Sequence, residues 1–463
     1  MIAALLPLPP VIDQTIHRVP LDPWSALGFV AVIAASAYLA FRRSPIILAV
    51  LAFAVPFAGY RDIGSTTLTV EKCLAFGTAV GLLLSGVPVL PKTAAARRVF
   101  LVGCLLLAAV AISGWHAVFP MHTAREFFKQ AEYLVLLWCA ATLMEQTLQG
   151  ERALLTGAVA GTAIVATLGL LQGIFGGAPS GIWINGHPVP RVAGTLEGPN
   201  QLAGFLEAAL PLIWIAPLII GRMPLLYSYV CAVSCGSLVL TQSRAGILVA
   251  ALTYGVLLKI NSKIARASVI PTIVGSLCGF LVIVGWLIFW AHASLADIDR
   301  LLRFTSLQPP GGVGTRAQLW HAAVMLFRSH PLTGVGAGNY ELLLPRVGLS
   351  GVQTQANSLY LQTLAEQGVV GFVMLLVFAF VALRETFRLR LRSPLALAAF
   401  LAFVSLLAHQ LVDDLFFFPK AASLAWLLLG AGTALPLRAE APSPVHFKIP
   451  AVQNVEQSVH ELT

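Results

Sequence analysis

Three arginines carry the most distinctive chemistry in this sequence, because each stands in a polar turn beside a long apolar stretch. Arg191 lies in "RVAGTLEGPN" and Arg244 in "TQSRAGILVA". Arg316, in "GTRAQLWHAAVMLFRSHPL", is predicted to start an amphipathic helix, because apolar residues recur there at helical spacing: Leu319, Trp320, Ala323, Val324 and Phe327. A guanidinium fork matches two phosphate oxygens at once, so arginines gathered at one place would suit a diphosphate group. A single arginine at such a position more often anchors a helix end to lipid headgroups. Taken one at a time, the arginines leave both interpretations open.

The elements that must position these arginines are membrane helices. The chain has 463 residues, of which 58% are hydrophobic and 11% charged, whereas a soluble protein carries about a quarter of its residues charged. Apolar runs of the length that crosses the bilayer recur along the whole chain. We predict an all-α polytopic bundle of 12 or 13 spans, near 24–41, 45–59, 68–90, 99–118, 127–147, 153–175, 200–220, 224–242, 245–260, 269–291, 358–383, 394–413 and 421–436.

The placement of the formal charge of +9 predicts orientation and does not indicate nucleic-acid binding. Basic residues mark cytoplasmic loops, and one set of short loops is rich in them: Arg42, Arg43, Lys92, Arg97, Arg98, Arg152, Arg222, Lys259, Lys263, Arg266, Arg384, Arg388, Arg390 and Arg392. The opposite, extracytoplasmic face then receives the turns at 60–70 and 119–126, the three arginines and a long loop. We therefore divide the chain into N-terminal spans (1–291), a periplasmic loop (292–357), C-terminal spans (358–436) and a disordered cytoplasmic tail (437–463).

Neither a metal nor a cofactor is expected. All six cysteines fall inside predicted spans, which argues against an extracytoplasmic disulfide framework, and Cys231 and Cys235 alone are too few ligands for a metal. The glycine pattern "GVGAGNY" has no strand before it, so we interpret it as a turn.

Four blocks in order resemble the O-antigen ligase and O-antigen polymerase family: "RVAGTLEGPNQLAGFLEAALPL", "TQSRAGILVA", "LWHAAVMLFRSHPLTGVGAGNY" and "QANSLYLQTLAEQGVVG". The resemblance covers roughly residues 150–420. It implies an enzyme of the bacterial inner membrane that moves a glycan from undecaprenyl diphosphate to an acceptor hydroxyl on the periplasmic face, without a metal ion. It also implies that Arg191 and Arg244 engage the diphosphate. Arg316 and Asn200 complete the predicted donor site.

The sequence departs from this family at one position that bears on the chemistry. Family members commonly have a histidine, proposed to deprotonate the acceptor, in the block that here reads "QTQANSLYLQ". Gln355 and Asn357 stand there instead, and an amide does not take up a proton at neutral pH. We expect both to bind substrate. General base catalysis contributes about 10²–10⁴-fold, so its loss need not abolish turnover.

A base elsewhere in the chain is the alternative. His330 and His321 lie in the long loop, and Glu366 lies where the family often has an acid; these three are the candidates for the base, although surface or helix-packing roles are common for such residues. His187 is close to Arg191 in sequence. Glu207 lies deep in a span and is expected to face a protein-lined cavity. His409 and Asp413, four residues apart, form either a helix-end pair or an orienting pair.

Two outcomes of the same chemistry stay open. A ligase would pass the glycan to lipid A-core, whereas a polymerase would pass it to another repeat unit. A non-enzymatic carrier or flippase for a lipid-linked sugar is the alternative from a different class, but it would need polar groups open to both faces, and here they gather on one.

Overall fold

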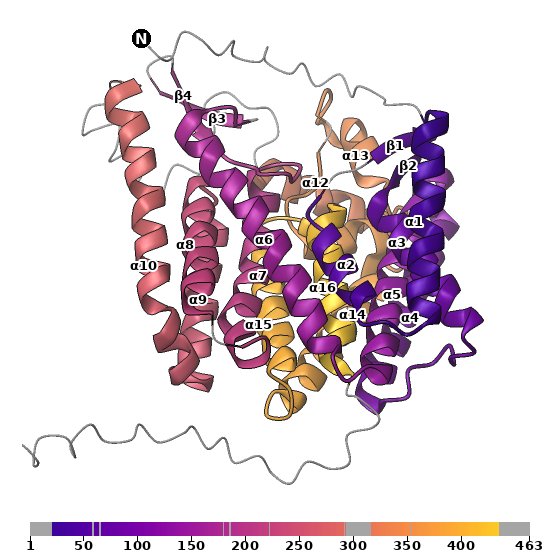
Figure 1. The fold of residues 1–463 in the computed structure, drawn as a ribbon. Coiled ribbons are helices and arrows are strands. Elements are labelled where there is room, and N and C mark those ends of the chain that lie inside the picture. Colours follow the sequence, from indigo (N-terminus) through magenta and orange to yellow (C-terminus); the bar gives the residue numbers. More distant parts are fainter. Residues whose placement is uncertain are drawn as a thin grey trace, which may run out of the picture.

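The fold is a bundle of helices with two short β-hairpins at one end, as a computed structural model shows (Figure 1). The structure describes residues 21–57, 60–63, 66–178, 180–184, 187–221, 223–290, 292, 316–352 and 354–434. The all-α polytopic class predicted from composition is confirmed. The predicted cytoplasmic tail at 437–463 and residues 293–315 of the predicted periplasmic loop lie outside the described residues.

Each predicted span contains a helix. These thirteen helices are α1 (Pro23–Phe41), α2 (Ile46–Ala54), α3 (Val70–Leu84), α4 (Ala94–Ser113), α5 (Pro120–Gln146), α6 (Gly150–Phe175), α7 (Pro199–Ile219), α8 (Pro224–Leu240), α9 (Arg244–Ile260), α10 (Ser262–Gly285), α14 (Leu359–Leu389), α15 (Pro394–His409) and α16 (Pro419–Thr433). Proline opens α1, α5, α7, α8, α15 and α16, a position where its missing N–H costs nothing.

Among the described residues, six helices are long and apolar enough to cross a membrane: α1, α4, α6, α7, α10 and α14. The helices α8 and α15 are apolar but shorter. With nine residues, α2 extends only about 14 Å at 1.5 Å per residue, half of what the span predicted at 45–59 needs. The total of 12 or 13 spans therefore stays a prediction.

Shorter elements gather at the end of the bundle that carries the hairpins (Figure 1). Strands β1 (Tyr60–Ile63) and β2 (Thr66–Thr69) pair antiparallel, as do β3 (Ser180–Ile184) and β4 (His187–Arg191). The helix predicted from Arg316 is confirmed as α12 (Arg316–Ser329). The remaining short elements are η1 (Gly114–His116), the π-helical η2 (Trp286–Trp290), α13 (Tyr340–Leu343), η3 (Leu344–Val347) and η4 (Leu415–Phe417).

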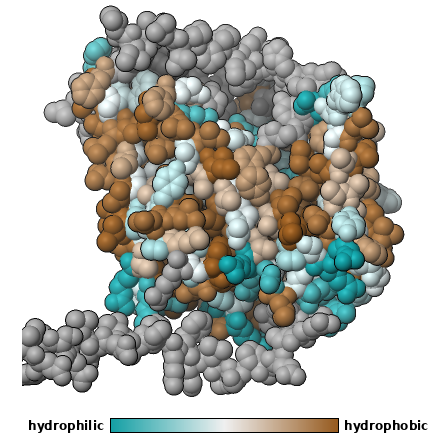
Figure 2. Space-filling view, viewed as in Figure 1, coloured by the Kyte–Doolittle hydropathy of each residue, from teal (hydrophilic) through white to brown (hydrophobic). Residues whose placement is uncertain are grey.

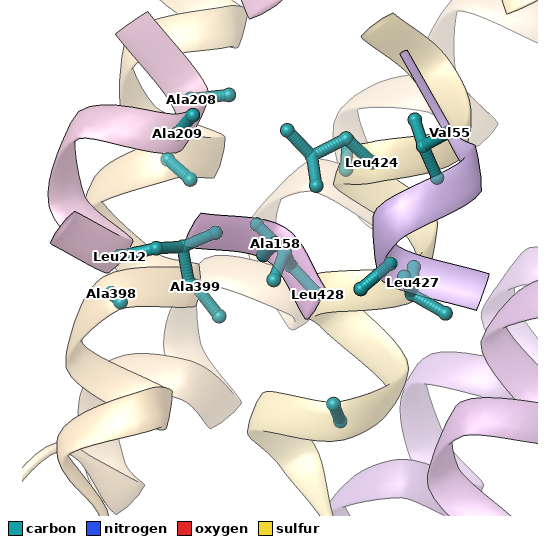
Figure 3. Close-up of a cluster of buried hydrophobic side chains, with 14 of the residues drawn as sticks. Val55, Ala158, Ala208, Ala209, Leu212, Ala398, Ala399, Leu424, Leu427 and Leu428 are labelled. Carbon is teal, nitrogen blue, oxygen red and sulfur yellow. The ribbon is translucent and has the colours of Figure 1, made fainter. Parts of the chain in front are cut away.

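In the core, α16 packs against α5, α7 and α15, and small residues let these helices approach closely. Figure 3 shows a part of this core in which side chains of α7, α15 and α16 gather with Ala158 of α6. Alanines such as Ala208, Ala209 and Ala399 alternate there with leucines, and Gly430 of α16 lies directly against the backbone of Leu137 in α5. Small side chains at helix contacts are the usual packing device where lipid removes the hydrophobic drive for association. Figure 2 shows apolar side chains over the middle of the visible face and polar ones toward one end.

Helix α14 is broken near its start, which the sequence did not predict. Gly368 has φ +62°, outside the helical region, so the residues before it and after it form two helical segments joined at a kink. The amides of Val335 and Gly336 donate to the carbonyls of Ala365 and Glu366, while those of Val369 and Val370 donate to Pro331 and Leu332. The segment 331–336 thus satisfies the backbone that the break exposes. A β-carbon at Gly334, with φ +71°, would collide with the backbone of Glu366.

Candidate functional site

The three arginines singled out from the sequence converge at the end of the bundle that carries the hairpins. Arg191 is the last residue of β4, Arg244 is the first residue of α9, and Arg316 is the first residue of α12. Burial lowers the pKa of the Arg191 guanidinium, the nearby positive charges of Arg316 and Arg244 lower it further, and Asp413 opposes them. One carboxylate, that of Asp413, thus acts on Arg191 against two neighbouring cations.

Arg191 is fixed by protein groups, which is not the geometry of an anchor extended into headgroups. Its Nε donates to the carbonyl of Thr241 at 2.9 Å and its Nη2 donates to Oδ1 of Asn200 at 3.1 Å. Thr241 ends α8 and precedes the turn to Arg244, where Ser243 caps α9 by accepting from the amide of Gly246. The tight turn predicted between two spans therefore places Arg191 beside the start of α9.

Helix starts add to the positive character of this region. Asn200 is the second residue of α7, and Arg244 and Arg316 begin their helices. The first amides of a helix lack intrahelical acceptors, and its dipole makes that end positive. The N-termini of α7, α9 and α12 thus reinforce the three guanidinium groups, an arrangement suited to phosphate oxygens.

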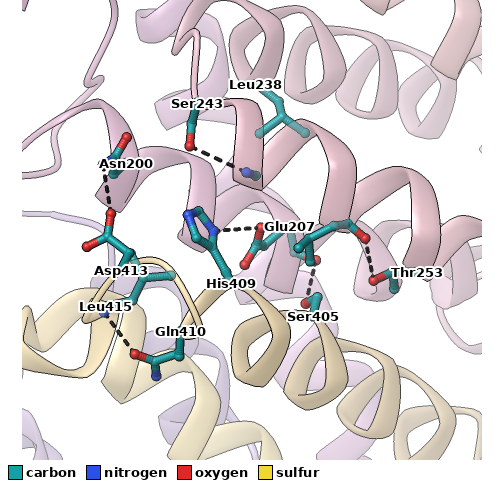
Figure 4. A network of polar contacts seen from close by, with 12 residues as sticks. Asn200, Glu207, Leu238, Ser243, Thr253, Ser405, His409, Gln410, Asp413 and Leu415 are labelled. Carbon is teal, nitrogen blue, oxygen red and sulfur yellow. Dashed lines mark hydrogen bonds and ion pairs between the residues drawn. The ribbon is translucent and has the colours of Figure 1, made fainter. Parts of the chain in front are cut away.

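Asn200 links the arginines to the C-terminal part of the chain. Its Nδ2 donates to Oδ2 of Asp413 at 2.7 Å, and the other carboxylate oxygen of Asp413 accepts from the amide of Asp414 at 2.8 Å (Figure 4). Asp413 follows α15, so this bond joins the start of α7 to the end of α15. Of the two roles predicted for Asp413, this geometry favours the orienting one, because its carboxylate holds the side chain of Asn200.

A second polar pair lies deeper between the same helices. His409 Nδ1 and Glu207 Oε2 are 3.1 Å apart, and both side chains are buried (Figure 4). The hydroxyl of Ser405 lies 3.4 Å from the carbonyl oxygen of Glu207. Glu207 therefore faces protein rather than lipid, while the cavity expected beside it stays a prediction. His409 and Asp413, four residues apart, contact Glu207 and Asn200 separately and do not pair with each other.

The block that replaces the family histidine runs into α14, whose first residue contacts the loop of Asp413. The amide of Leu359, which begins α14, donates to the carbonyls of Gln410 and Asp413, both at 3.1 Å. Gln355 is buried, and the amide of Ala356 next to it donates to Oε1 of Gln362 at 2.8 Å. Asn357 has φ +49°, a left-handed conformation that few side chains other than Asn, Asp and His adopt. The start of α14 is therefore linked to the arginines through Asp413 and Asn200.

The three candidates for the base lie in different places. His321 is exposed on α12. His330 follows the other end of α12, about 20 Å along the helix from Arg316, where its Nδ1 lies 3.0 Å from Ser329 Oγ and its ring lies 5.5 Å from that of His116. Glu366 is buried in α14, where Oε1 accepts from the amide of Tyr340 and from Nε2 of Gln362. Of the three, His321 is nearest in sequence to the arginines.

Some residues of the site had only weak signals in the sequence. The carbonyl of Thr241 cannot be recognised from residue type, whereas Glu207 was indicated by an acid in an apolar run. For His409 and Asp413 the signal was their spacing of four. The side chain of His187 is not described. Among the described residues, no group of three or more His, Cys, Asp or Glu side chains is arranged to hold a metal ion.

Comparison with known proteins identifies one family. Residues 229–376 match the family model described as O-antigen ligase. A comparison with curated proteins finds no match. The matched range contains Arg244, Arg316 and the block from Gln355 to Glu366, whereas Arg191, Asn200 and Asp413 lie outside it and are joined to it by the contacts above.

Proposed function

Residues 229–376 form an O-antigen ligase family domain in a multi-pass membrane protein, and from this premise we propose that the chain is a glycosyltransferase of the bacterial inner membrane. It moves a glycan from undecaprenyl diphosphate to an acceptor hydroxyl on the periplasmic face, without a metal ion. The acceptor oxygen forms a bond to the anomeric carbon, and the bond from that carbon to the diphosphate oxygen breaks. The diphosphate leaves with the electron pair.

The convergence of Arg191, Arg244 and Arg316 is the observation that carries this proposal. Negative charge grows on the diphosphate as it leaves, so fixed cations stabilise the transition state more than the bound substrate. Asn200 holds Arg191 in place, and we expect Gln355 and Asn357 to hydrogen-bond a sugar. The hydroxyl proton goes to a base for which His321, His330 and Glu366 remain the candidates, or directly to water.

The periplasmic placement of the site rests on the basic residues at the opposite end. Acidic residues there are few, and each has a structural role. Glu385 is buried and accepts from Arg98 Nε and Nη2 at 3.1 and 3.0 Å. Glu145 accepts from the amides of Lys92 and Thr93. This leaves an excess of positive charge on that face, the pattern of a cytoplasmic surface.

The topology is tested by single cysteines in a protein without its six native ones. Cysteines at residue 310 and beside Arg191 should react with an impermeant thiol reagent in spheroplasts, and one at residue 388 should not. The opposite labelling would place the arginines in the cytoplasm and overturn the proposal.

The chemistry is tested by replacing the arginines. Arg191→Ala and Arg244→Ala should each lower the rate of glycan transfer by about 10²–10³-fold, the effect of removing one donor to a developing charge. Arg191→Lys and Arg244→Lys should recover only part of that rate, because a lysine cannot bind two phosphate oxygens at once. Arg346→Ala, at an exposed arginine of η3, is the matched control and should retain full activity. Full activity in both test variants would favour headgroup anchoring.

A gene deletion separates the two outcomes of the reaction. Loss of the O-chain ladder from lipopolysaccharide, with an intact lipid-linked polymer, indicates a ligase that uses lipid A-core as acceptor. Shortened chains indicate a polymerase. Accumulation of lipid-linked glycan on the cytoplasmic face would instead support the carrier or flippase.

A further inference from the structure

A cavity lies beside the first turns of α14, which line it. Its volume is about 70 Å³, and its walls come from α4, α5, α14, α16 and the loops at Gly338 and Asp414. At about 10–15 Å³ for each water position, it would hold roughly five water molecules, comparable with a single sugar ring. The half-buried residues Glu126, Lys129 and Phe417 surround its outer part, and buried Tyr133 and Trp426 lie at its inner part.

Two buried polar atoms at this cavity have no hydrogen-bond partner. Tyr133 is 2% exposed and Gln367 is 6% exposed, yet the Tyr133 hydroxyl and Gln367 Oε1 are both unsatisfied. Leaving such a group unpaired costs about 1–3 kcal/mol, so buried polar groups almost always have a partner. A phenol donates and an amide oxygen accepts. A hydroxyl group both accepts and donates, so a ligand that carries hydroxyl groups can satisfy both atoms.

The charges at the cavity disfavour an anion. Lys129 is the one cation among the described residues that line the cavity, and it is already paired with Glu126 at 2.7 Å; Glu366 and Asp414 add only carboxyl groups. A diphosphate would therefore find no free positive charge there. Carboxyl oxygens do accept hydrogen bonds from hydroxyl groups, so the polar wall suits a neutral polyol.

Aromatic rings supply an apolar wall of the kind that packs against the C–H face of a sugar. Tyr133 and Phe378 stack on the two sides of the Trp426 ring, with centroids at 6.2 and 4.7 Å. Lys129 Nζ lies 4.7 Å from the centre of the Phe417 ring and donates to its carbonyl at 3.3 Å. These contacts keep the aromatic wall and the outer part of the cavity in fixed positions.

The cavity and the arginine site share a wall. Asp413 contacts Asn200, while the next residue, Asp414, lines the cavity. Leu359 also lines the cavity, and its amide donates to the carbonyl of Asp413. We propose that this cavity binds an uncharged pyranose ring of the acceptor glycan, next to the sugar whose hydroxyl attacks. This proposal rests on the proposed function, because it assigns the acceptor side of that reaction.

Two substitutions test the assignment in the full-length protein. Tyr133→Phe removes one hydroxyl and should raise the acceptor KM about tenfold, the effect of one lost hydrogen bond, while the KM for the lipid-linked donor stays within twofold. Gln130→Trp, at a half-buried lining residue, should fill the cavity and raise the acceptor KM further. Tyr227→Phe is the matched control: its hydroxyl is also buried and unpaired, but it lines a different cavity, and both KM values should stay unchanged.

Binding is measured separately from turnover. Methyl glucoside, galactoside, mannoside and rhamnoside are tested by saturation-transfer NMR, and at least one should bind native protein and Arg191→Ala protein equally but not Gln130→Trp protein. If a pyranoside binds the cavity but Arg191→Ala leaves glycan transfer unchanged, the proposed function fails and the sugar site stands. No binding by any pyranoside, with an unchanged acceptor KM in Tyr133→Phe, would mean that the cavity holds water only. A raised donor KM with an unchanged acceptor KM would assign it to the donor glycan. Either result overturns the proposal.

Discussion

The side-chain amide of Asn200 donates to the carboxylate of Asp413 at 2.7 Å, across 213 positions of sequence. Its carbonyl oxygen faces the other way and accepts from Arg191 at 3.1 Å. Asp413 therefore orients the side-chain amide of Asn200, and that amide in turn orients Arg191. Without Asp413, the amide could rotate and present its NH₂ group to the guanidinium.

The first prediction concerns this relay. Asn200→Ala should lower the kcat of glycan transfer about tenfold, because a hydrogen bond to a charged group contributes about 1.5–3 kcal/mol, and Asp413→Asn should have a similar effect. Asn261→Ala, which removes an asparagine that caps α10, is the control and should leave kcat unchanged. Steady-state transfer assays at equal amounts of folded protein check this. An unchanged kcat in Asn200→Ala would show that Arg191 needs no orientation.

The second prediction concerns the buried pair of Glu207 and His409. Removing one partner of a buried pair costs about 3–5 kcal/mol when a charge is left behind, so His409→Ala should sharply reduce the yield of folded protein and its melting temperature. Glu207→Gln combined with His409→Gln restores a neutral hydrogen-bonded pair and should recover most of the stability. Melting in detergent provides the measurement. A His409→Ala protein as stable as the native one would mean that the pair contributes nothing.

The third prediction concerns the absent histidine. The left-handed backbone at Asn357 accepts histidine, so Asn357→His should fold. If the acceptor hydroxyl lies there, it should raise transfer about tenfold near pH 7.5 and add a limb near the ordinary histidine pKa of about 6.5 to the pH–rate profile. Asn357→Ala should instead lose about tenfold. No change in either variant, with both folded, would place the acceptor elsewhere.

The fourth prediction follows from Asp414. Burial raises the pKa of this carboxyl from 3.8 to about 7; Asp413 and Glu126 act in the same direction, while Lys129 and the amide of Phe417 oppose them. The unfolded chain therefore releases this proton at a lower pH than the folded protein. The associated stability is present below pH 4 and is lost as pH rises toward 7, by up to about 1.4 kcal/mol per pH unit.

Asp414→Asn should flatten that dependence while keeping the cap on η4, since asparagine also accepts from the amide of Phe417. Melting temperatures of the native and variant proteins between pH 4.5 and 8 check this. A native protein whose stability rises over this interval, with the same slope in the variant, would contradict the raised pKa.

The sequence predicted the helices well because hydropathy is a local property. The range expected for α7 differs from the observed helix by one residue at each end, whereas the range expected for α10 lies six to seven residues too far along the chain. Helix α12 begins at Arg316, as predicted. The break in α14 was not predicted, because the segment 331–336 that satisfies its backbone is not adjacent in sequence. The hairpin β1–β2 was expected only as a turn, since its strands have four residues each.

The site was predicted as a set of residue types but not as a geometry. Arg191, Arg244 and Arg316 were recognisable because charge is rare in this chain. The contact of Asn200 with Asp413 had no local signal, since its two residues lie in different helix ends. Tyr133 and Gln367 looked like ordinary residues of apolar helices, and only the folded structure shows that they line one cavity with unsatisfied polar atoms.

The interrupted helix α14 has a consequence for biogenesis. The amides of Val369 and Val370 find their acceptors at Pro331 and Leu332, in a segment that on the proposed topology is exported before α14 leaves the translocon. Until that segment docks, the freed amides face lipid or the translocation channel unsatisfied, at several kcal/mol each. We therefore expect the first turns of α14 to mature late, after translocation of the preceding loop. Substitutions at Gly334 or Gly368 would then act as assembly defects, seen as protein that is inserted and degraded.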